Sequence, residues 1–101
     1  MKLTKLDEPM QDLLGNVMLF GDKPLTLRTA IITIISKGFA KDPVAAMEIP
    51  HKLMHAAEVK GYDGSCTLTN AEGELLKEAA LTDRNFPNLV KAQVIKAVKG
   101  K

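Results

Sequence analysis

The two histidines of the chain have the spacing of metal ligands. His51 and His55 lie four residues apart, so on a helix both imidazoles would project from one face. Glu48 and Glu58 lie about a turn away on either side. A metalloprotease helix has a glutamate directly after its first histidine, and Lys52 occupies that place here. Because a closed zinc site would lack ligands, we expect no metal, and His51 and His55 remain only candidate ligands on a solvated face.

Residues 61–72 have the outline of a calcium loop, with Asp63 and Ser65 at alternating positions and Glu72 at the end. The first position of this loop is a glycine instead of a carboxylate, and Cys66 replaces the invariant glycine. The charge that a hard cation needs is therefore missing, and we expect no calcium binding.

Ser65 and Cys66 are the candidate nucleophiles. Ser65 lacks the second glycine two residues later that a nucleophile elbow requires. Cys66 would need a histidine beside it, which the sequence does not establish, and a small buried thiol is the usual outcome. The chain has no glycine-rich phosphate loop. We therefore expect a protein that is not an enzyme, with no catalytic residues and no cofactor.

Lysines gather near the C-terminus, at Lys91, Lys96, Lys99 and Lys101. Cations near the end of a helix are stabilised by its dipole by about 0.3–1 kcal/mol each, which explains them without a ligand. A phosphate-binding face would combine them with arginine and stacking aromatics, and residues 88–101 have neither. The net charge of +2 is also small. We expect no nucleic-acid partner; the candidates for one are Lys91, Lys96 and Lys99.

The composition predicts one small domain over residues 1–101, because 101 residues leave no room for two cores. The chain is 46% hydrophobic with few aromatics, so the core should be aliphatic. A single cysteine excludes an internal disulfide and fits a reducing compartment. No apolar run approaches the roughly 20 residues that cross a bilayer, and the charged N-terminus is unlike a signal peptide. We expect a cytoplasmic protein that does not bind membranes.

The most apolar stretch is Leu25–Ser36, and it predicts a central helix at residues 26–37. Its polar residues recur every three or four positions, and apolar side chains occupy most of the remaining circumference. A buried strand is the alternative, because isoleucine and threonine are β-branched. About a dozen residues before Gly38 favour a helix, and Thr26 is a suitable N-cap.

Three further helices are predicted at residues 43–60, 70–81 and 87–99. The first begins at Asp42-Pro43, and Pro50 should kink or split it. The second begins with a capping box, Thr69-Asn-Ala-Glu72. The inward-facing residues of the 43–60 helix are expected to be Met47, Leu53, Met54 and Ala57, with Ile49 as a further candidate.

The N-terminal part predicts extended structure. Residues 1–10 read as a short edge strand or an arm, and residues 11–24 as a hairpin and turn. Gly15-Asn16 between two apolar runs favours the hairpin; a helix broken at Gly15 is the alternative. A Leu-Thr step at residues 25–26 and again at 68–69 suggests that these two extended pieces lie side by side. The expected fold class is mainly α (α+β minor), a compact three- to four-helix domain with a short N-terminal β-hairpin or two short strands.

Several motifs together resemble a group of small proteins encoded by tailed bacteriophages and prophages. They are an extended Val17–Phe20, Pro24-Leu-Thr-Leu before an isoleucine-rich helix, Thr67-Leu-Thr-x-x-Glu-x-x-Leu-Leu-Lys77, and Val90-x-x-Gln-Val94. The resemblance covers residues 13–98. It implies a fold and no activity, because these motifs are caps and core positions and the group supplies no functional residues.

These observations predict a small non-enzymatic phage-encoded protein that acts through protein–protein interaction in the host cytoplasm. Its role would be to modulate a host enzyme, to counter a defence system or to assist assembly. The partner would be a host or phage protein, and a homodimer is left open. The alternatives are a nucleic-acid-binding regulator that uses the basic C-terminal helix and a minor structural component of the virion.

Overall fold

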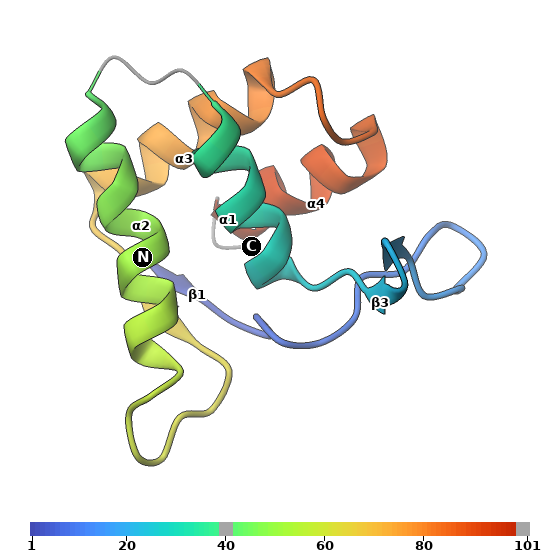
Figure 1. The fold of residues 1–101 in the computed structure, drawn as a ribbon, viewed down its shortest axis with the longest axis horizontal. Helices are drawn as coiled ribbons and strands as arrows, with labels where there is room; N and C mark the ends of the chain where they lie inside the picture. Colours follow the sequence, from blue (N-terminus) through green and yellow to red (C-terminus); the bar gives the residue numbers. More distant parts are fainter. Residues whose placement is uncertain (39–41, 99–101) are drawn as a thin grey trace.

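Helix α1 (Leu27–Lys37) occupies the middle of the fold in the computed structural model, which describes residues 1–38 and 42–98. The backbone of Thr26 is extended, and its hydroxyl accepts a hydrogen bond from the N–H of Thr29, which caps the helix. Helix α1 contacts all three of the other described helices (Figure 1). Its buried side chains are aliphatic: Leu27, Ala30, Ile31, Ile34 and Ile35. The prediction of a central helix is confirmed.

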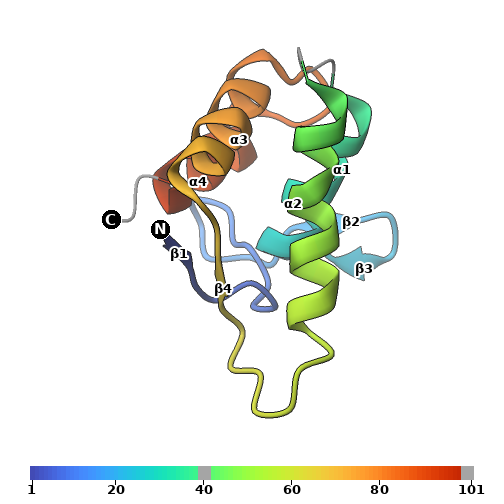
Figure 2. The ribbon, with the colours of Figure 1, turned by 90° about the vertical axis from the view of Figure 1, so that its left-hand side faces the viewer.

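The other helices are α2 (Pro43–Ala56), α3 (Asn70–Thr82) and α4 (Asn88–Val98). In Figure 2, α1 and α2 lie on one side and α3 and α4 on the other, and each pair packs closely. Two short antiparallel strand pairs complete the described residues, so the predicted class, mainly α with minor β, is confirmed. None of the described helices is long and apolar enough to cross a bilayer.

Helix α2 differs from its prediction in length. It ends at Ala56 rather than at residue 60, because Glu58 and Val59 bond to carbonyls three residues back and the chain then turns at Gly61 with φ +85°. The helix also runs through Pro50 without being split. Pro50 is buried, as is Ile49 before it, so packing compensates for the missing backbone donor. At the other end of the chain, α4 begins one residue after the predicted Pro87, and its predicted end at residue 99 lies outside the described residues.

The inward face of α2 was predicted only in part. Ile49 and Leu53 are fully buried, as expected. Met47 and Met54 are instead exposed by 39% and 55%. The face that packs on the rest of the protein is centred on Ala46, Ile49 and Leu53, at steps of three and four, and both methionines lie to one side of it.

Residues 1–10 contain the predicted short strand and contribute to the core. Strand β1 (Lys2–Leu3) pairs antiparallel with β4 (Cys66–Thr67), and Leu3 faces Cys66. The terminal ammonium of Met1 donates to the Leu68 carbonyl at 2.8 Å. Three side chains of this segment join the main core: Leu3, Leu6 and Met10. The N-terminus is therefore held by the same packing as the helices.

The two Leu-Thr steps do not pair with each other, and that prediction is wrong. The piece at residues 66–68 pairs with residues 1–3, whereas Leu25 and Thr26 pair with Pro9 and Met10. A different part of the N-terminal segment thus holds each piece. Pairing between segments so far apart in sequence is set by tertiary packing, so two similar local motifs did not identify their partners.

Residues 11–24 contain two chain reversals. The first is at residues 12–16, where Gln11 and Val17 form an isolated bridge and Gly15 has φ +84°. The second joins β2 (Leu19–Phe20) to β3 (Lys23–Pro24) through Gly21, with φ +69°. A hairpin was predicted at the first reversal, but the paired strands flank the second. Both reversals lie in the part of the ribbon that projects at the right of Figure 1.

Candidate functional site

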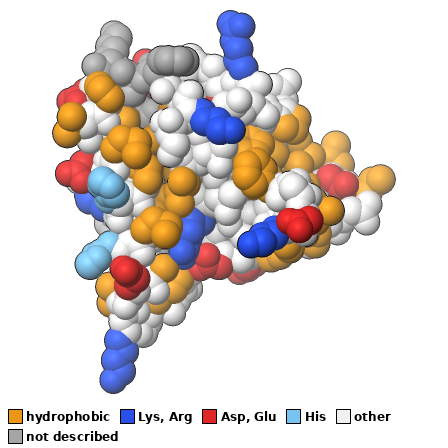
Figure 3. All heavy atoms as spheres, viewed as in Figure 1, with side chains coloured by type: hydrophobic (Ala, Val, Ile, Leu, Met, Phe, Trp, Pro, Cys, Tyr) orange, Lys and Arg blue, Asp and Glu red, His pale blue; other side chains and the backbone are white. Residues whose placement is uncertain are grey.

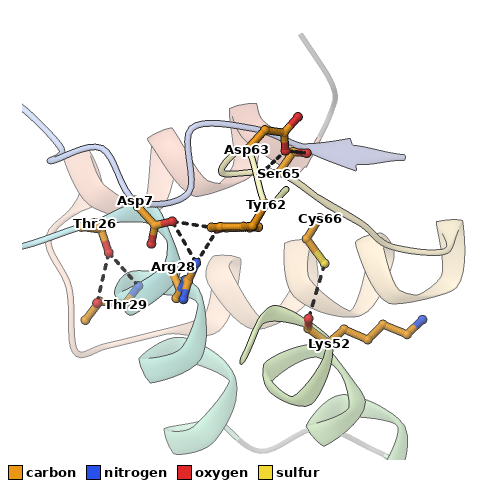
Figure 4. A network of polar contacts seen from close by, with 9 residues as sticks. All are labelled: Asp7, Thr26, Arg28, Thr29, Lys52, Tyr62, Asp63, Ser65 and Cys66. Carbon is orange, nitrogen blue, oxygen red and sulfur yellow. Dashed lines mark hydrogen bonds and ion pairs between the residues drawn. The ribbon is translucent and has the colours of Figure 1, made fainter. Parts of the chain in front are cut away.

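The predicted histidine pair lies on the open face of α2. His51 and His55 are both exposed, and no group of three histidine, cysteine or carboxylate side chains within the described residues could hold a metal ion. Cys66 lies on the other side of the helix, where its Sγ contacts the Lys52 carbonyl at 3.8 Å (Figure 4). The structure therefore does not bring the thiol to either imidazole.

Cys66 is the buried thiol that the sequence suggested. Its side chain is 8% exposed in β4, and burial raises the pKa of its thiol above the usual value, with a smaller lowering from the charge of Lys52. A thiol with a raised pKa forms little thiolate, and the thiolate is the nucleophile. This environment favours a packing role for Cys66.

The residues with the outline of a calcium loop have other partners. One Asp63 oxygen accepts hydrogen bonds from the N–H and the hydroxyl of Ser65, which form a tight turn (Figure 4). These bonds and the nearby Lys2 lower the pKa of the Asp63 carboxyl against a smaller effect of burial. Glu72 lies at the cap of α3 and is paired with Lys52. The turn is thus explained without an ion.

The candidate lysines of the C-terminal helix do not share one free surface. The Nζ of Lys91 donates to the Asp83 carbonyl at 2.7 Å and thereby satisfies the end of α3. Lys96 is exposed and lines a groove between α4 and the N-terminal segment. Lys99 lies outside the described residues. The described lysines therefore do not form a continuous basic stripe along α4.

A polar network ties three distant segments together. Asp7 in the N-terminal segment accepts hydrogen bonds from Arg28, in the first turn of α1, and from the hydroxyl of Tyr62, in the loop after α2 (Figure 4). Arg28 also donates to the Tyr62 hydroxyl, and its guanidinium carbon lies 5.3 Å from the centre of that ring. Burial, followed by the bond to Asp7, raises the pKa of Tyr62. Each of the three side chains has a hydrogen-bond partner in the other two, although the buried Nε of Arg28 has none among the described residues. The network therefore links the three segments structurally.

The most unusual surface is the turn at residues 12–16. Leu13 and Leu14 are 89% and 87% exposed, the highest values among the large hydrophobic side chains of the described residues. Further apolar side chains are exposed on the same projection: Val17, Leu19 and Phe20. Figure 3 shows hydrophobic side chains along this projection at the right of the view. We call residues 11–20 the apolar arm.

The arm has a defined backbone. The Asp12 carboxylate accepts hydrogen bonds from the N–H groups of Leu14 and Asn16 at 2.9 and 3.0 Å. The N–H of Asp12 donates to the Asn16 carbonyl, and the positive φ of Gly15 permits the turn. At its base, the Phe20 ring packs on Phe86, 5.7 Å between centroids. Leu13 and Leu14 are thus held in place while their side chains face solvent.

The arm was missed as a site, although its signal was present in the sequence. Leu13-Leu14 and Val17 to Phe20 flank a Gly-Asn pair, a pattern that predicts the two sides of a hairpin. A turn of this size cannot bury leucines at its own tip. The outer face of α2 carries a second apolar surface, formed by Val44, Met47 and Met54, and the two histidines interrupt it.

Comparisons with protein-family models, with curated proteins and with solved structures give no match to this chain.

Proposed function

We propose that this chain is a small non-enzymatic, phage-encoded protein that binds another protein through the apolar arm. The observation that supports the proposal is the pair Leu13 and Leu14, almost fully exposed on a turn whose backbone is fixed by hydrogen bonds. The phage origin rests on the resemblance of residues 13–98 alone. Modulation of a host enzyme, defence evasion and assembly are the roles such binding would serve.

Exposed leucines at a fixed turn lower the solubility of a protein, and a contiguous exposed apolar patch commonly marks an interaction surface. Burying each leucine side chain would stabilise a complex by about 1.5–3 kcal/mol before the costs of association. The fixed backbone lowers one of those costs, because less conformational freedom is lost on binding. These arguments favour the arm over the outer face of α2, where Val44 is 78% exposed but Met47 and Met54 only 39% and 55%.

The test is a binding measurement on an identified partner. A photoreactive side chain placed at Leu14 in the intact protein would crosslink the partner in the bacterial host, and the crosslinked protein would be purified. Its affinity would then be measured for the wild type and for Leu13→Asp/Leu14→Asp. We expect the double variant to bind at least about a hundredfold more weakly, because two carboxylates would be buried against an apolar surface.

The matched control is Leu81→Asp, which introduces the same group at an exposed leucine on α3, 61% exposed and outside the arm. This variant should retain the wild-type affinity. Equal losses in both variants, or none in the arm variant, would contradict the proposal. Sedimentation of the purified chain would show whether the partner is a second copy, and a gel shift at low salt would reveal nucleic-acid binding if the regulator alternative holds.

A further inference from the structure

A groove of about 820 Å³ lies between the N-terminal segment and the last turns of α4. Its floor contains Met10 and Leu27, which are nearly buried. Three lysines of the described residues line it, Lys2 and Lys5 from the N-terminal segment and Lys96 from α4. The sequence separates these lysines by more than ninety positions at the extremes, so only the fold brings them to one groove.

The backbone at Lys5 contributes to this arrangement. Its φ is +56°, the only positive value of a non-glycine residue within the part of the chain that the structure describes. The bend lets Leu6 enter the core while the exposed Lys5 lines the groove. Leu6 is held there by a hydrogen bond from its N–H to the Gly64 carbonyl at 2.9 Å. A left-handed lysine is unfavourable and persists where surrounding contacts determine it, commonly at functional sites.

The lining of the groove carries a net positive charge. Three ammonium groups face a single carboxylate, Glu8, among the lining residues. None of the three lysines forms an ion pair with a described residue, although Lys2 lies close enough to Asp63 to lower the pKa of that carboxyl. Lys5 and Lys96 are therefore the cations best placed to meet carboxylates of a ligand.

The lining favours a peptide over a nucleic acid. The described residues that line the groove include no arginine and no aromatic side chain on which a base would stack. Its apolar floor and the amide of Gln93 suit side chains and main chain of a polypeptide.

The groove leads directly to the base of the apolar arm. Gln11, the first residue of the arm, lines the groove and forms a bridge with Val17 across the turn. The Gln93 side chain donates to the Gln11 carbonyl at 3.1 Å and so fixes α4 against that point. We propose that the groove binds an acidic segment of the same protein partner that takes the arm, with its carboxylates at Lys5 and Lys96. This inference rests on the proposed function.

The experiment uses the full chain and a labelled peptide of Glu-Glu-Leu repeats long enough to span the groove. Fluorescence anisotropy would compare the wild type with Lys5→Gln/Lys96→Gln. The matched control, Lys60→Gln/Lys77→Gln, removes the same charge from the loop after α2 and from α3, outside the groove. We expect about a tenfold or greater loss for the first variant and less than about twofold for the second. Binding should also weaken as salt rises.

NMR spectra of the backbone amides with and without the Glu-Glu-Leu peptide would locate its binding site. The chemical-shift changes should concentrate at Lys5, Gln93 and Lys96. Three results would overturn the inference: equal binding of a Gln-Gln-Leu peptide, equal losses in both lysine variants, or stronger binding of a duplex oligonucleotide. Failure of the proposed function is distinguishable, because Leu13→Asp/Leu14→Asp should leave peptide binding intact. If that variant also leaves the partner's affinity unchanged, the arm proposal falls while the acid-binding groove stands.

Discussion

The Nζ of Lys52 lies 2.8 Å from Oε1 of Glu72, and the same oxygen accepts a hydrogen bond from the N–H of Thr69 at 2.8 Å. One carboxylate thus caps α3 and joins it to α2. Glu72 is 9% exposed, so water competes little for its oxygens. Lys52, whose position removed the resemblance to a metalloprotease helix, serves here as the ion-pair partner of the capping box.

This pairing predicts a pH-dependent stability. Burial alone would raise the pKa of Glu72, but the bonds from Lys52 and Thr69 outweigh it and lower the pKa below its usual value of 4.5. Because the folded pKa lies below the unfolded one, the stabilisation is present above about pH 4.5 and is lost as pH falls through the folded pKa. Urea unfolding across this range should show the free energy of unfolding fall more steeply for the wild type than for Glu72→Gln.

Glu58→Gln is the control, because Glu58 is an exposed carboxylate outside the network. It should follow the wild-type pH profile. Identical profiles for the wild type and Glu72→Gln would show that the ion pair contributes nothing to acid unfolding.

The cap itself gives a second prediction. The Thr69 hydroxyl accepts a hydrogen bond from the N–H of Glu72 at 3.1 Å, which satisfies a free donor of the first turn of α3. Thr69→Ala should lower the free energy of unfolding by about 1 kcal/mol, whereas Thr69→Ser, which keeps the hydroxyl, should lower it much less. Chemical denaturation of the two variants would measure the difference. A loss of equal size in both would mean that the methyl group, and not the hydroxyl, matters at this cap.

The caps were predictable because they are local. Thr26, Asp42 and Thr69 each satisfy donors within three residues, and the structure has all three at the predicted helix starts. The pairing of β1 with β4 was not predictable in the same way, since it joins residues more than sixty positions apart. The prediction that Met47 and Met54 face the core was wrong for another reason. Apolar character alone does not tell which side of a helix faces the core when both sides carry apolar residues.

The candidate surfaces depended on the fold even more strongly. Lys96 was a candidate from its charge, but its neighbours in the groove, Lys2 and Lys5, come from the other end of the chain. Lys91 had the same sequence signal and is instead bound to the Asp83 carbonyl. Residue type therefore gave a list of candidates, and only tertiary structure separated the free lysine from the occupied one.

The exposed leucines of the arm should matter for binding and contribute little to the free energy of unfolding. Leu13 and Leu14 have almost no contacts to lose, so Leu14→Ala should change the free energy of unfolding by no more than about 0.5 kcal/mol. Ile31 is fully buried in α1, and its replacement by alanine should lower the free energy of unfolding by about 2–5 kcal/mol. Urea denaturation of Leu14→Ala and Ile31→Ala tests the contrast. A marked destabilisation by Leu14→Ala would mean that the leucine packs on the protein in solution and is not a free docking residue.

The reactivity of the Cys66 thiol should report how often β1 separates from β4. Its side chain is buried in β4, where it faces Leu3 of β1, and burial raises the pKa of the thiol. Alkylation of the native protein near neutral pH should therefore be at least about a hundredfold slower than in urea, since reaction requires local opening. The matched control is Thr67→Cys in a Cys66→Ser background, which moves the thiol to the exposed neighbour on the same strand. That thiol should react at close to its unfolded rate, and fast labelling of native Cys66 would mean that β1 separates from β4 readily.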